Sequence, residues 1–244
     1  MVTVEFLRQN FKERKALRCY LLLRSNGLGY AGYTENHIEF LQSKGYSQAT
    51  AYRFINKLTK LGWITVTPKG VKVKSVHRIT NTRNRYAISI SNDNIATFSI
   101  FEAYLFASLL LSKCQADYKR KLRDERQHTK EESVESSYRS FDLHTMLTTD
   151  YVGADYLGIT KSMFNRIKKI SCRLGFLKVR YALNKKINFK TKSEALNFLG
   201  HNPMYKRVQK VEDIYYIVYG SVYSINSILF ISQYAGINRI QKAN

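Results

Sequence analysis

The segment that most constrains the fold is Ser47–Trp63, SQATAYRFINKLTKLGW. Its apolar side chains recur at spacings of three and four, the pattern of a helix with one buried face. They are Ala51, Phe54, Ile55, Leu58 and Leu61. The hydroxyl of Ser47 can accept hydrogen bonds from the free N–H groups of a first helical turn. Gly62 suits the left-handed conformation in which many helices end. The sequence therefore predicts a capped amphipathic helix over residues 47–61.

The opposite face of this predicted helix is polar and presents Gln48, Tyr52, Arg53 and Asn56. Such side chains donate and accept hydrogen bonds in the way that base edges in a DNA major groove require. A shorter helix is predicted over 34–44, with Thr34 as its cap and Gly45–Tyr46 as the turn between the two helices. Trp63–Val66 has the composition of a strand. The predicted order is therefore helix, turn, polar-faced helix and strand.

Further strands are predicted from period-two alternation at residues 71–74 and 86–90. The loop between them includes Thr80–Arg85. No acidic neighbour is present to hold Arg83 and Arg85, so these arginines are predicted to contact a minor groove or phosphates. An ordinary solvated hairpin is the alternative for this loop.

A second segment of the same kind lies at Thr160–Leu177, TKSMFNRIKKISCRLGFL. In both segments a capping hydroxyl precedes a helix-ending glycine by 15 residues: Ser47 and Gly62, then Thr160 and Gly175. The same alignment pairs Arg53 with Arg166. It also pairs Leu58 with Ser171, which means either that the second helix is rotated or that it is the less faithful copy. The flanks are predicted as a helix over 150–157, a turn at Gly158, a strand over 177–183, a basic turn at 184–186 and a helix over 193–199.

Charge is distributed unevenly along the chain, whose formal net charge is +22. Residues 40–92 and 156–193 contain no Asp or Glu, and together they carry 21 Lys and Arg. The other residues hold 19 basic and 18 acidic side chains, so the two acid-free windows account for almost all of the net charge. Two such surfaces suit a polyanion, because each phosphate that Lys or Arg neutralises releases condensed counterions.

Both segments resemble the winged-helix DNA-binding superfamily. That pattern has a small capping residue, an Arg soon after the first buried position, and Leu-Gly followed by an aromatic or aliphatic residue. Ser47–Ile64 is a good match and Thr160–Leu177 a fair one. The resemblance implies an α+β, mainly helical fold with two winged helix-turn-helix domains in tandem. These domains are predicted at residues 1–93 and 94–244, the second with a helical linker and a C-terminal extension.

The resemblance also implies that both helices enter major grooves of duplex DNA. Arg53 and Arg166 would bind guanine through paired hydrogen bonds, the alternative being an ion pair within each domain. Tyr52 would either contact DNA or pack against the wing. Base or phosphate contacts are implied for Ser47, Gln48, Tyr52, Arg53, Asn56, Lys57, Lys69, Lys72, Arg83, Arg85, Lys161, Ser162, Asn165, Arg166, Lys169, Arg173 and Lys185.

Catalysis is the competing class of function. The histidines show no metal-ligand spacing, and they are His37, His77, His128, His144 and His201. Four C-terminal tyrosines invite comparison with tyrosine recombinases, but no matching Arg and His set accompanies Tyr215, Tyr216, Tyr219 and Tyr223. Gly27–Gly32 matches G-x-G-x-x-G but lacks the later acid that would hold a ribose. The sequence therefore predicts a non-enzymatic protein with no cofactor and no metal.

Double-stranded DNA is the predicted partner, and a homodimer through the apolar segment 218–230 is a further expectation. No run of about 18 apolar residues is present to cross a membrane. Three widely spaced cysteines fit neither a disulfide framework nor a zinc site, so a cytoplasmic, nucleoid-associated protein is predicted. Transcription regulators of phages and plasmids share the resemblance, and regulation of a mobile element is the main prediction. A plasmid or phage replication initiator is the alternative, and an interaction scaffold is a third hypothesis.

Overall fold

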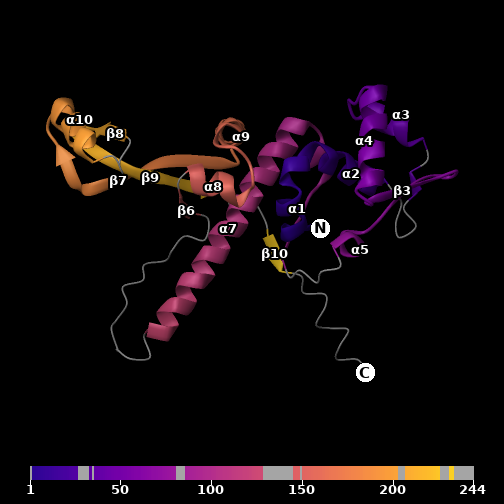
Figure 1. The fold of residues 1–244 in the computed structure, drawn as a ribbon, viewed down its shortest axis with the longest axis horizontal. Helices are drawn as coiled ribbons and strands as arrows, with labels where there is room; N and C mark the ends of the chain where they lie inside the picture. The colour runs from indigo at the N-terminus through magenta and orange to yellow at the C-terminus, as the bar shows by residue number, and fades with distance from the viewer. Residues whose placement is uncertain are drawn as a thin grey trace. The chain divides into compact units, whose positions relative to one another are not determined.

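The structure is a computed structural model (Figure 1), and it describes residues 2–26, 33–34, 36–80, 86–128, 145–148, 150–202, 207–225 and 231–233. The fold is α+β, with helices and small antiparallel sheets. It divides into two compact units. The first contains the residues up to Leu109 together with the strand at 231–233, and the second is Leu110–Leu229. The division therefore lies inside a helix, later in the chain than the predicted boundary at residue 93.

The described part of the first unit contains two small sheets and a group of helices. Its elements are β1 (Val2–Thr3), α1 (Val4–Gln9), η1 (Phe11–Glu13), α2 (Arg14–Asn26), β2 (Tyr33–Thr34), α3 (His37–Ser43), α4 (Gln48–Lys60), β3 (Ile64–Thr67), β4 (Gly70–Val73), α5 (Val76–Thr80), β5 (Tyr86–Ile88), α6 (Asn92–Ile95), the start of α7 (Phe98–His128) and β10 (Ile231–Gln233). The strand orders are β2-β4-β3 and β1-β5-β10, and all pairs are antiparallel.

The predicted cap at Thr34 is wrong. Thr34 lies in β2, where it pairs with Val71 of β4, and α3 begins only at His37. Asn36 occupies the position before α3 with a left-handed φ of 47° and makes no side-chain cap. The strand pairing with β4, which local sequence does not encode, therefore delays the start of this helix.

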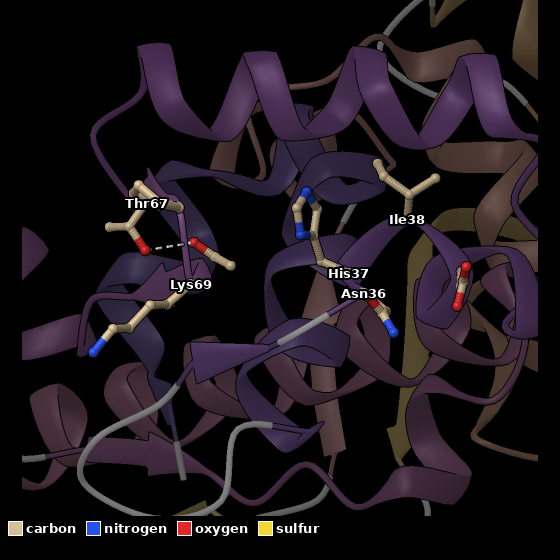
Figure 2. A pocket seen from close by; sticks show the side chains of 8 residues that line it. Asn36, His37, Ile38, Thr67 and Lys69 are labelled. Atoms are coloured by element: carbon tan, nitrogen blue, oxygen red, sulfur yellow. Dashed lines mark hydrogen bonds between the residues drawn. The ribbon is translucent and has the colours of Figure 1, made fainter.

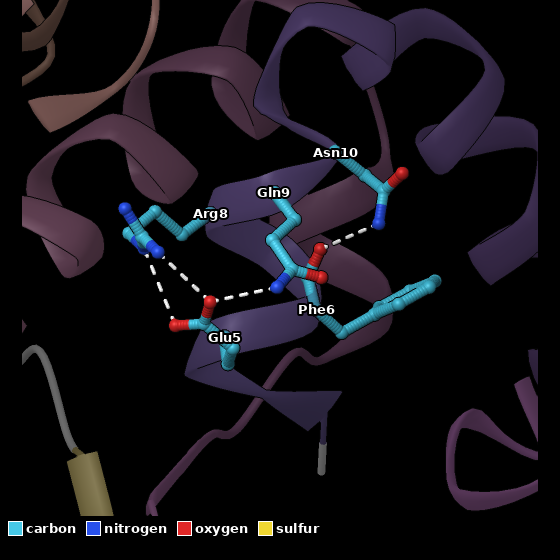
Figure 3. Close-up of polar contacts among 5 residues, drawn as sticks. All are labelled: Glu5, Phe6, Arg8, Gln9 and Asn10. Carbon is cyan, nitrogen blue, oxygen red and sulfur yellow. Dashed lines mark hydrogen bonds and ion pairs between the residues drawn. The ribbon is translucent and has the colours of Figure 1, made fainter. Parts of the chain in front are cut away.

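Helix α1 neutralises its own acidic residue. The carboxylate of Glu5 accepts hydrogen bonds from Arg8, at 2.8 and 3.3 Å, and from Gln9 at 2.8 Å (Figure 3). The hydrogen bonds from Arg8 are the main reason that the pKa of Glu5 lies below its usual value. Asn10 donates to the carbonyl of Phe6 at 2.8 Å where the helix ends. This acid is thus paired within its own helix.

An aromatic cluster joins the N-terminal helices to the end of α4. The ring of Trp63 lies 5.0 Å from that of Phe6 and 5.4 Å from that of Tyr20, centroid to centroid. The hydroxyl of Tyr20 donates to the carbonyl of Lys74 at 2.8 Å, which ties α2 to the residue that follows β4. Contacts of this kind contribute about 0.5–1.5 kcal/mol each beyond the area that they bury. They fix the exit of α4 relative to α2.

Helix α7 is continuous from Phe98 to His128 (Figure 1). Residues 101–111 are all buried, so this part of the helix is enclosed on every side. It carries one buried carboxylate, that of Glu102, which accepts a hydrogen bond from Arg14 of α2 at 2.5 Å. Arg18 of α2 donates to the carbonyls of Ile95 and Ala96 at 2.9 and 2.7 Å. Two buried arginines therefore connect α2 to the α6–α7 region.

In the residues that the structure describes, the second unit contains one four-stranded antiparallel sheet and three helices besides its part of α7. The elements are β6 (Thr145–Thr148), α8 (Asp150–Tyr156), α9 (Lys161–Arg173), β7 (Leu177–Phe189), α10 (Lys192–His201), β8 (Arg207–Val211) and β9 (Ile214–Ile225). Strand β9 is central, since it pairs with β6, β7 and β8. The backbone of most of the apolar C-terminal segment is therefore used for pairing within the chain.

One local prediction in the second unit is wrong, and one predicted helix is longer than expected. Residues 184–186 do not form a turn. Strand β7 continues to Phe189, and its register against β9 shifts between Asn184 and Asn188, so the basic residues lie in a bulge. Helix α10 contains the predicted helix over 193–199 and extends it at both ends; Thr191 caps it through a reciprocal capping box with Glu194.

The two units share a strand topology. In each, the strand before the helix pair (β2 or β6) is antiparallel to the last strand (β4 or β9), which is also antiparallel to the strand after the second helix (β3 or β7). The hairpin of the first unit closes through Pro68–Lys69, whereas the second unit places α10 and β8 between the two arms. The sequence repeat is thus accompanied by a repeat of sheet order.

A glycine in α8 is required by close packing. A Cβ atom at Gly153 would lie 2.5 Å from the ring of Phe164, which is fully buried. We expect Gly153→Ala to lower the free energy of unfolding by about 1–3 kcal/mol, measured by urea denaturation. Gly200 of α10 is the matched control, because a Cβ there meets nothing within 4 Å. Gly200→Ala should leave stability unchanged or raise it by up to about 1 kcal/mol, and equal losses in both variants would contradict the packing argument.

Candidate nucleic-acid interface

Helices α3 and α4 form a tight pair whose turn and caps follow the predicted pattern. Gly45 in the turn has φ 86°, and Gly62 after α4 has φ 70°. The hydroxyl of Ser47 accepts from the backbone N–H of Thr50 at 3.3 Å, which confirms the predicted cap. The N–H of Trp63 donates to the carbonyl of Leu58 at 3.0 Å and closes the end of the helix.

Helices α8 and α9 repeat the caps, the turn and the closing hydrogen bond of this pair. Gly158 has φ 62° and Gly175 has φ 75°. The hydroxyl of Thr160 accepts from the N–H of Met163 at 3.2 Å, which confirms the second predicted cap. The N–H of Phe176 donates to the carbonyl of Ser171 at 3.0 Å, as Trp63 does to Leu58. Every partner lies 113 residues after its counterpart, so α4 and α9 have the same register.

The same register rules out a rotated second helix. Ser171 is fully buried, as is Leu58 at the equivalent position of α4, while Ile170 is only half-buried. Phe164 and Ile167 occupy the buried positions of Ala51 and Phe54. Helix α9 is therefore the less faithful copy in sequence, with its buried face unchanged in direction.

The start of α4 is held by an aromatic pair in the turn. The ring of Tyr46 lies 5.8 Å from that of Phe54, edge to face, and the guanidinium of Arg18 lies 5.2 Å from the Tyr46 ring centre. Burial raises the pKa of Tyr46 to about 12, so its hydroxyl stays protonated at neutral pH. This contact connects the α3–α4 turn to α2 and fixes the direction of the helix.

The polar face of α4 is exposed as predicted. Gln48, Arg53 and Asn56 are exposed, and Tyr52 is 51 % exposed, so Tyr52 is not packed away. Within the described part of the chain these side chains form no hydrogen bond or ion pair, and Arg53 only lies over the ring of its neighbour Phe54, at 5.4 Å. The predicted alternative of an ion pair for Arg53 therefore finds no support among the described residues.

One predicted phosphate ligand of α4 is already paired. Lys57 forms an ion pair with Glu13 of η1, and both side chains are about two-fifths exposed. Sequence reasoning missed this because the acid lies outside the acid-free window and 44 residues earlier in the chain. It also missed Lys60, which is exposed on the same side of α4 as Arg53 and Asn56. The repeat contained that signal, since Lys60 aligns with Arg173.

The outer face of α9 is more strongly basic. Lys161, Ser162, Arg166, Lys169 and Arg173 are exposed, and Asn165 is half-buried beside them. Lys168 instead points to α8, where its ammonium contacts both carboxylate oxygens of Asp150 at 2.8 and 2.9 Å. That pair is mostly shielded from solvent, so Lys168 serves the packing of α8 on α9. The exposed cations of the outer face are therefore Lys161, Arg166, Lys169 and Arg173, and Lys168 is not one of them.

The hairpin of the first unit adds exposed lysines beside a pocket. Lys69 and Lys72 are exposed on the β3–β4 hairpin. A pocket of about 580 Å³ lies between the hairpin tip, Thr67–Gly70, and the start of α3, Asn36–Glu39 (Figure 2). Burial lowers the pKa of His37, so this wall of the pocket carries no imidazolium charge at neutral pH. The remaining predicted contacts, Arg83, Arg85 and the side chain of Lys185, lie outside the described residues.

The described residues hold no group of three or more His, Cys, Asp or Glu placed to bind a metal ion. Cys19 and Cys114 are buried, Cys172 is exposed, and all three are free thiols. Among the described helices, none is long and apolar enough to cross a membrane.

No protein-family model, curated protein or solved structure matches this chain. What bears on function is therefore the chain's own geometry and charge. Several acidic residues of the described part form ion pairs with nearby cations, as in Glu5–Arg8, Lys113–Asp117 and Asp150–Lys168. The outer faces of α4 and α9 retain exposed Arg and Lys with no acid on the same face.

Proposed function

We propose that the chain binds double-stranded DNA without catalysis, through two winged helix-turn-helix units whose recognition helices are α4 and α9. The observation that carries the proposal is the repeated register. Two helices with the same caps, turns and buried positions each present an Arg, Arg53 or Arg166, at the same exposed position. A helix that projects polar and cationic side chains beside a hairpin suits a major groove, with phosphates on either side.

The supporting electrostatic argument is the absence of Asp and Glu from the two stretches of sequence that contain α4 and α9. Every Lys or Arg exposed on α4 and α9 belongs to an acid-free window of the sequence. Duplex DNA presents one negative charge per about 1.7 Å of its axis, so these faces gain affinity from counterion release. We propose that the protein regulates transcription of a mobile element and associates with the nucleoid. The homodimer through the C-terminal segment stays a prediction.

The two central arginines give the direct test. In a selection from a random duplex pool, Arg53→Ala and Arg166→Ala should each weaken binding to the selected site by about 1–3 kcal/mol, roughly 5- to 150-fold, with a small effect on random DNA. Fluorescence anisotropy measures both affinities. Arg123→Ala is the matched control, because Arg123 is an exposed arginine of α7 outside both faces. Equal losses on selected and random DNA would show that the arginine binds phosphate only.

A replication initiator is the second candidate, supported by the pair of unlike units on one chain. Footprinting on the element's own DNA separates the two roles. A single site upstream of a promoter supports regulation, whereas iterated sites beside an AT-rich segment, with strand opening, support initiation. A scaffold that binds proteins through apolar surface would instead retain its partners at high salt.

A further inference from the structure

The common register of α4 and α9 allows their outer faces to be compared residue by residue. Equivalent exposed positions hold Gln48 and Lys161, Arg53 and Arg166, Asn56 and Lys169, and Lys60 and Arg173. The arginine is shared. At two positions, α4 has a neutral amide where α9 has a lysine.

Amide side chains and lysine side chains contact different parts of DNA. A Gln or Asn amide has a donor and an acceptor in fixed geometry and pairs with the N6 and N7 groups of adenine. A Lys ammonium is a flexible point charge that suits phosphate oxygens, which carry no base information. The α4 face is therefore better equipped to discriminate bases and the α9 face to neutralise phosphates.

Ion pairs within each unit increase the difference in available positive charge between the outer faces of α4 and α9. On α4, Lys57 is held by Glu13, which reduces the positive charge available at the edge of that face. On α9, the paired lysine is Lys168, which is directed to Asp150 of α8 and lies off the outer face. Lys161 and Lys169 are exposed and form no ion pair among the residues that the structure describes.

Resting on the proposed function, we propose that α4 supplies most of the base discrimination and α9 most of the salt-dependent affinity. Gln48 and Asn56 are then specificity-determining residues, and Lys161 and Lys169 are phosphate-binding residues. The shared arginines contribute to both helices alike and do not distinguish them.

The division can be tested by exchanging the side chains at equivalent positions of α4 and α9. Lys161→Gln/Lys169→Asn gives α9 the side chains of α4, and Gln48→Lys/Asn56→Lys gives α4 those of α9. All four positions are exposed, and circular dichroism with thermal unfolding checks that both double variants keep the wild-type fold. The probes are a random-sequence duplex pool, from which each protein selects a consensus, and one labelled random duplex titrated at several KCl concentrations.

The Lys161→Gln/Lys169→Asn protein should select the wild-type consensus while its slope of log affinity against log salt becomes shallower by about 2, since each phosphate contact contributes about 0.9. The Gln48→Lys/Asn56→Lys protein should bind random duplex more tightly, with a steeper slope, and select a consensus that has lost adenine positions. A changed consensus in the first protein with an unchanged slope, or an intact consensus in the second, would overturn the division. A wild-type chain that binds no duplex would overturn the proposed function itself and the division with it.

Discussion

Raising the salt concentration from about 50 to 200 mM should lower the affinity of this protein for duplex DNA by about 10³- to 10⁵-fold, if it contacts roughly 6–10 phosphates. The slope of log affinity against log salt would be about −5 to −9. The reason is the supply of exposed cations in acid-free windows, on the outer faces of α4 and α9 and on the β3–β4 hairpin. Fluorescence anisotropy with a labelled duplex measures the slope directly.

The control for this titration is the Arg123→Ala protein, whose slope should equal that of the wild type because Arg123 lies on neither face. A nearly flat salt dependence in the wild type would be incompatible with phosphate binding by these helices. It would favour the scaffold hypothesis, in which apolar contacts persist at high salt.

Removing the buried carboxylate of Glu102 should cost about 3–5 kcal/mol of unfolding free energy. The side chains of Arg14 and Glu102 are only 8 % and 1 % exposed, and their N–O distance is 2.5 Å. In Glu102→Leu, the Arg14 guanidinium would lose its counterion and face a largely apolar core beside Phe11. Urea denaturation followed by circular dichroism measures the loss.

Two further variants test whether the unpaired Arg14 charge causes the loss of stability in Glu102→Leu. Arg14→Met/Glu102→Leu removes both charges, so it should recover most of the stability that Glu102→Leu loses. Asp213→Asn breaks an exposed pair with Lys210, whose N–O distance is 3.3 Å, and should leave stability essentially unchanged because solvent screens that pair. If Glu102→Leu cost no more than Asp213→Asn, the buried pair would have no structural importance.

The parts of the site that sequence predicted correctly depend on local chemistry. The caps at Ser47 and Thr160 and the helix ends at Gly62 and Gly175 involve residues only a few positions apart, so their pattern is present in the sequence. The exposed face of α4 follows from the same periodicity, because a buried stripe at spacings of three and four defines the opposite surface. The repeat extended these predictions to α9.

The parts that sequence did not predict depend on residues distant in the chain. Glu13 reaches Lys57 only because η1 and α4 come together in the folded unit. Thr34 satisfies the consensus for a helix cap, but pairing with β4 takes it into a strand. The basic residues at 184–186 resemble a turn, yet β9 is long enough to pair with β7 on both sides of them. In each case a tertiary partner outweighed a local preference.

Strand β5 is bordered by the first and the last described strands of the chain, β1 on one edge and β10 on the other. Strand β10 is translated only after the whole second unit. During synthesis on the ribosome, one edge of β5 therefore stays unpaired until β10 has been made. An unpaired strand edge is a template for pairing with other chains. The β1-β5-β10 sheet is thus open to misassembly for longer than the translation of the first unit's N-terminal part alone would take.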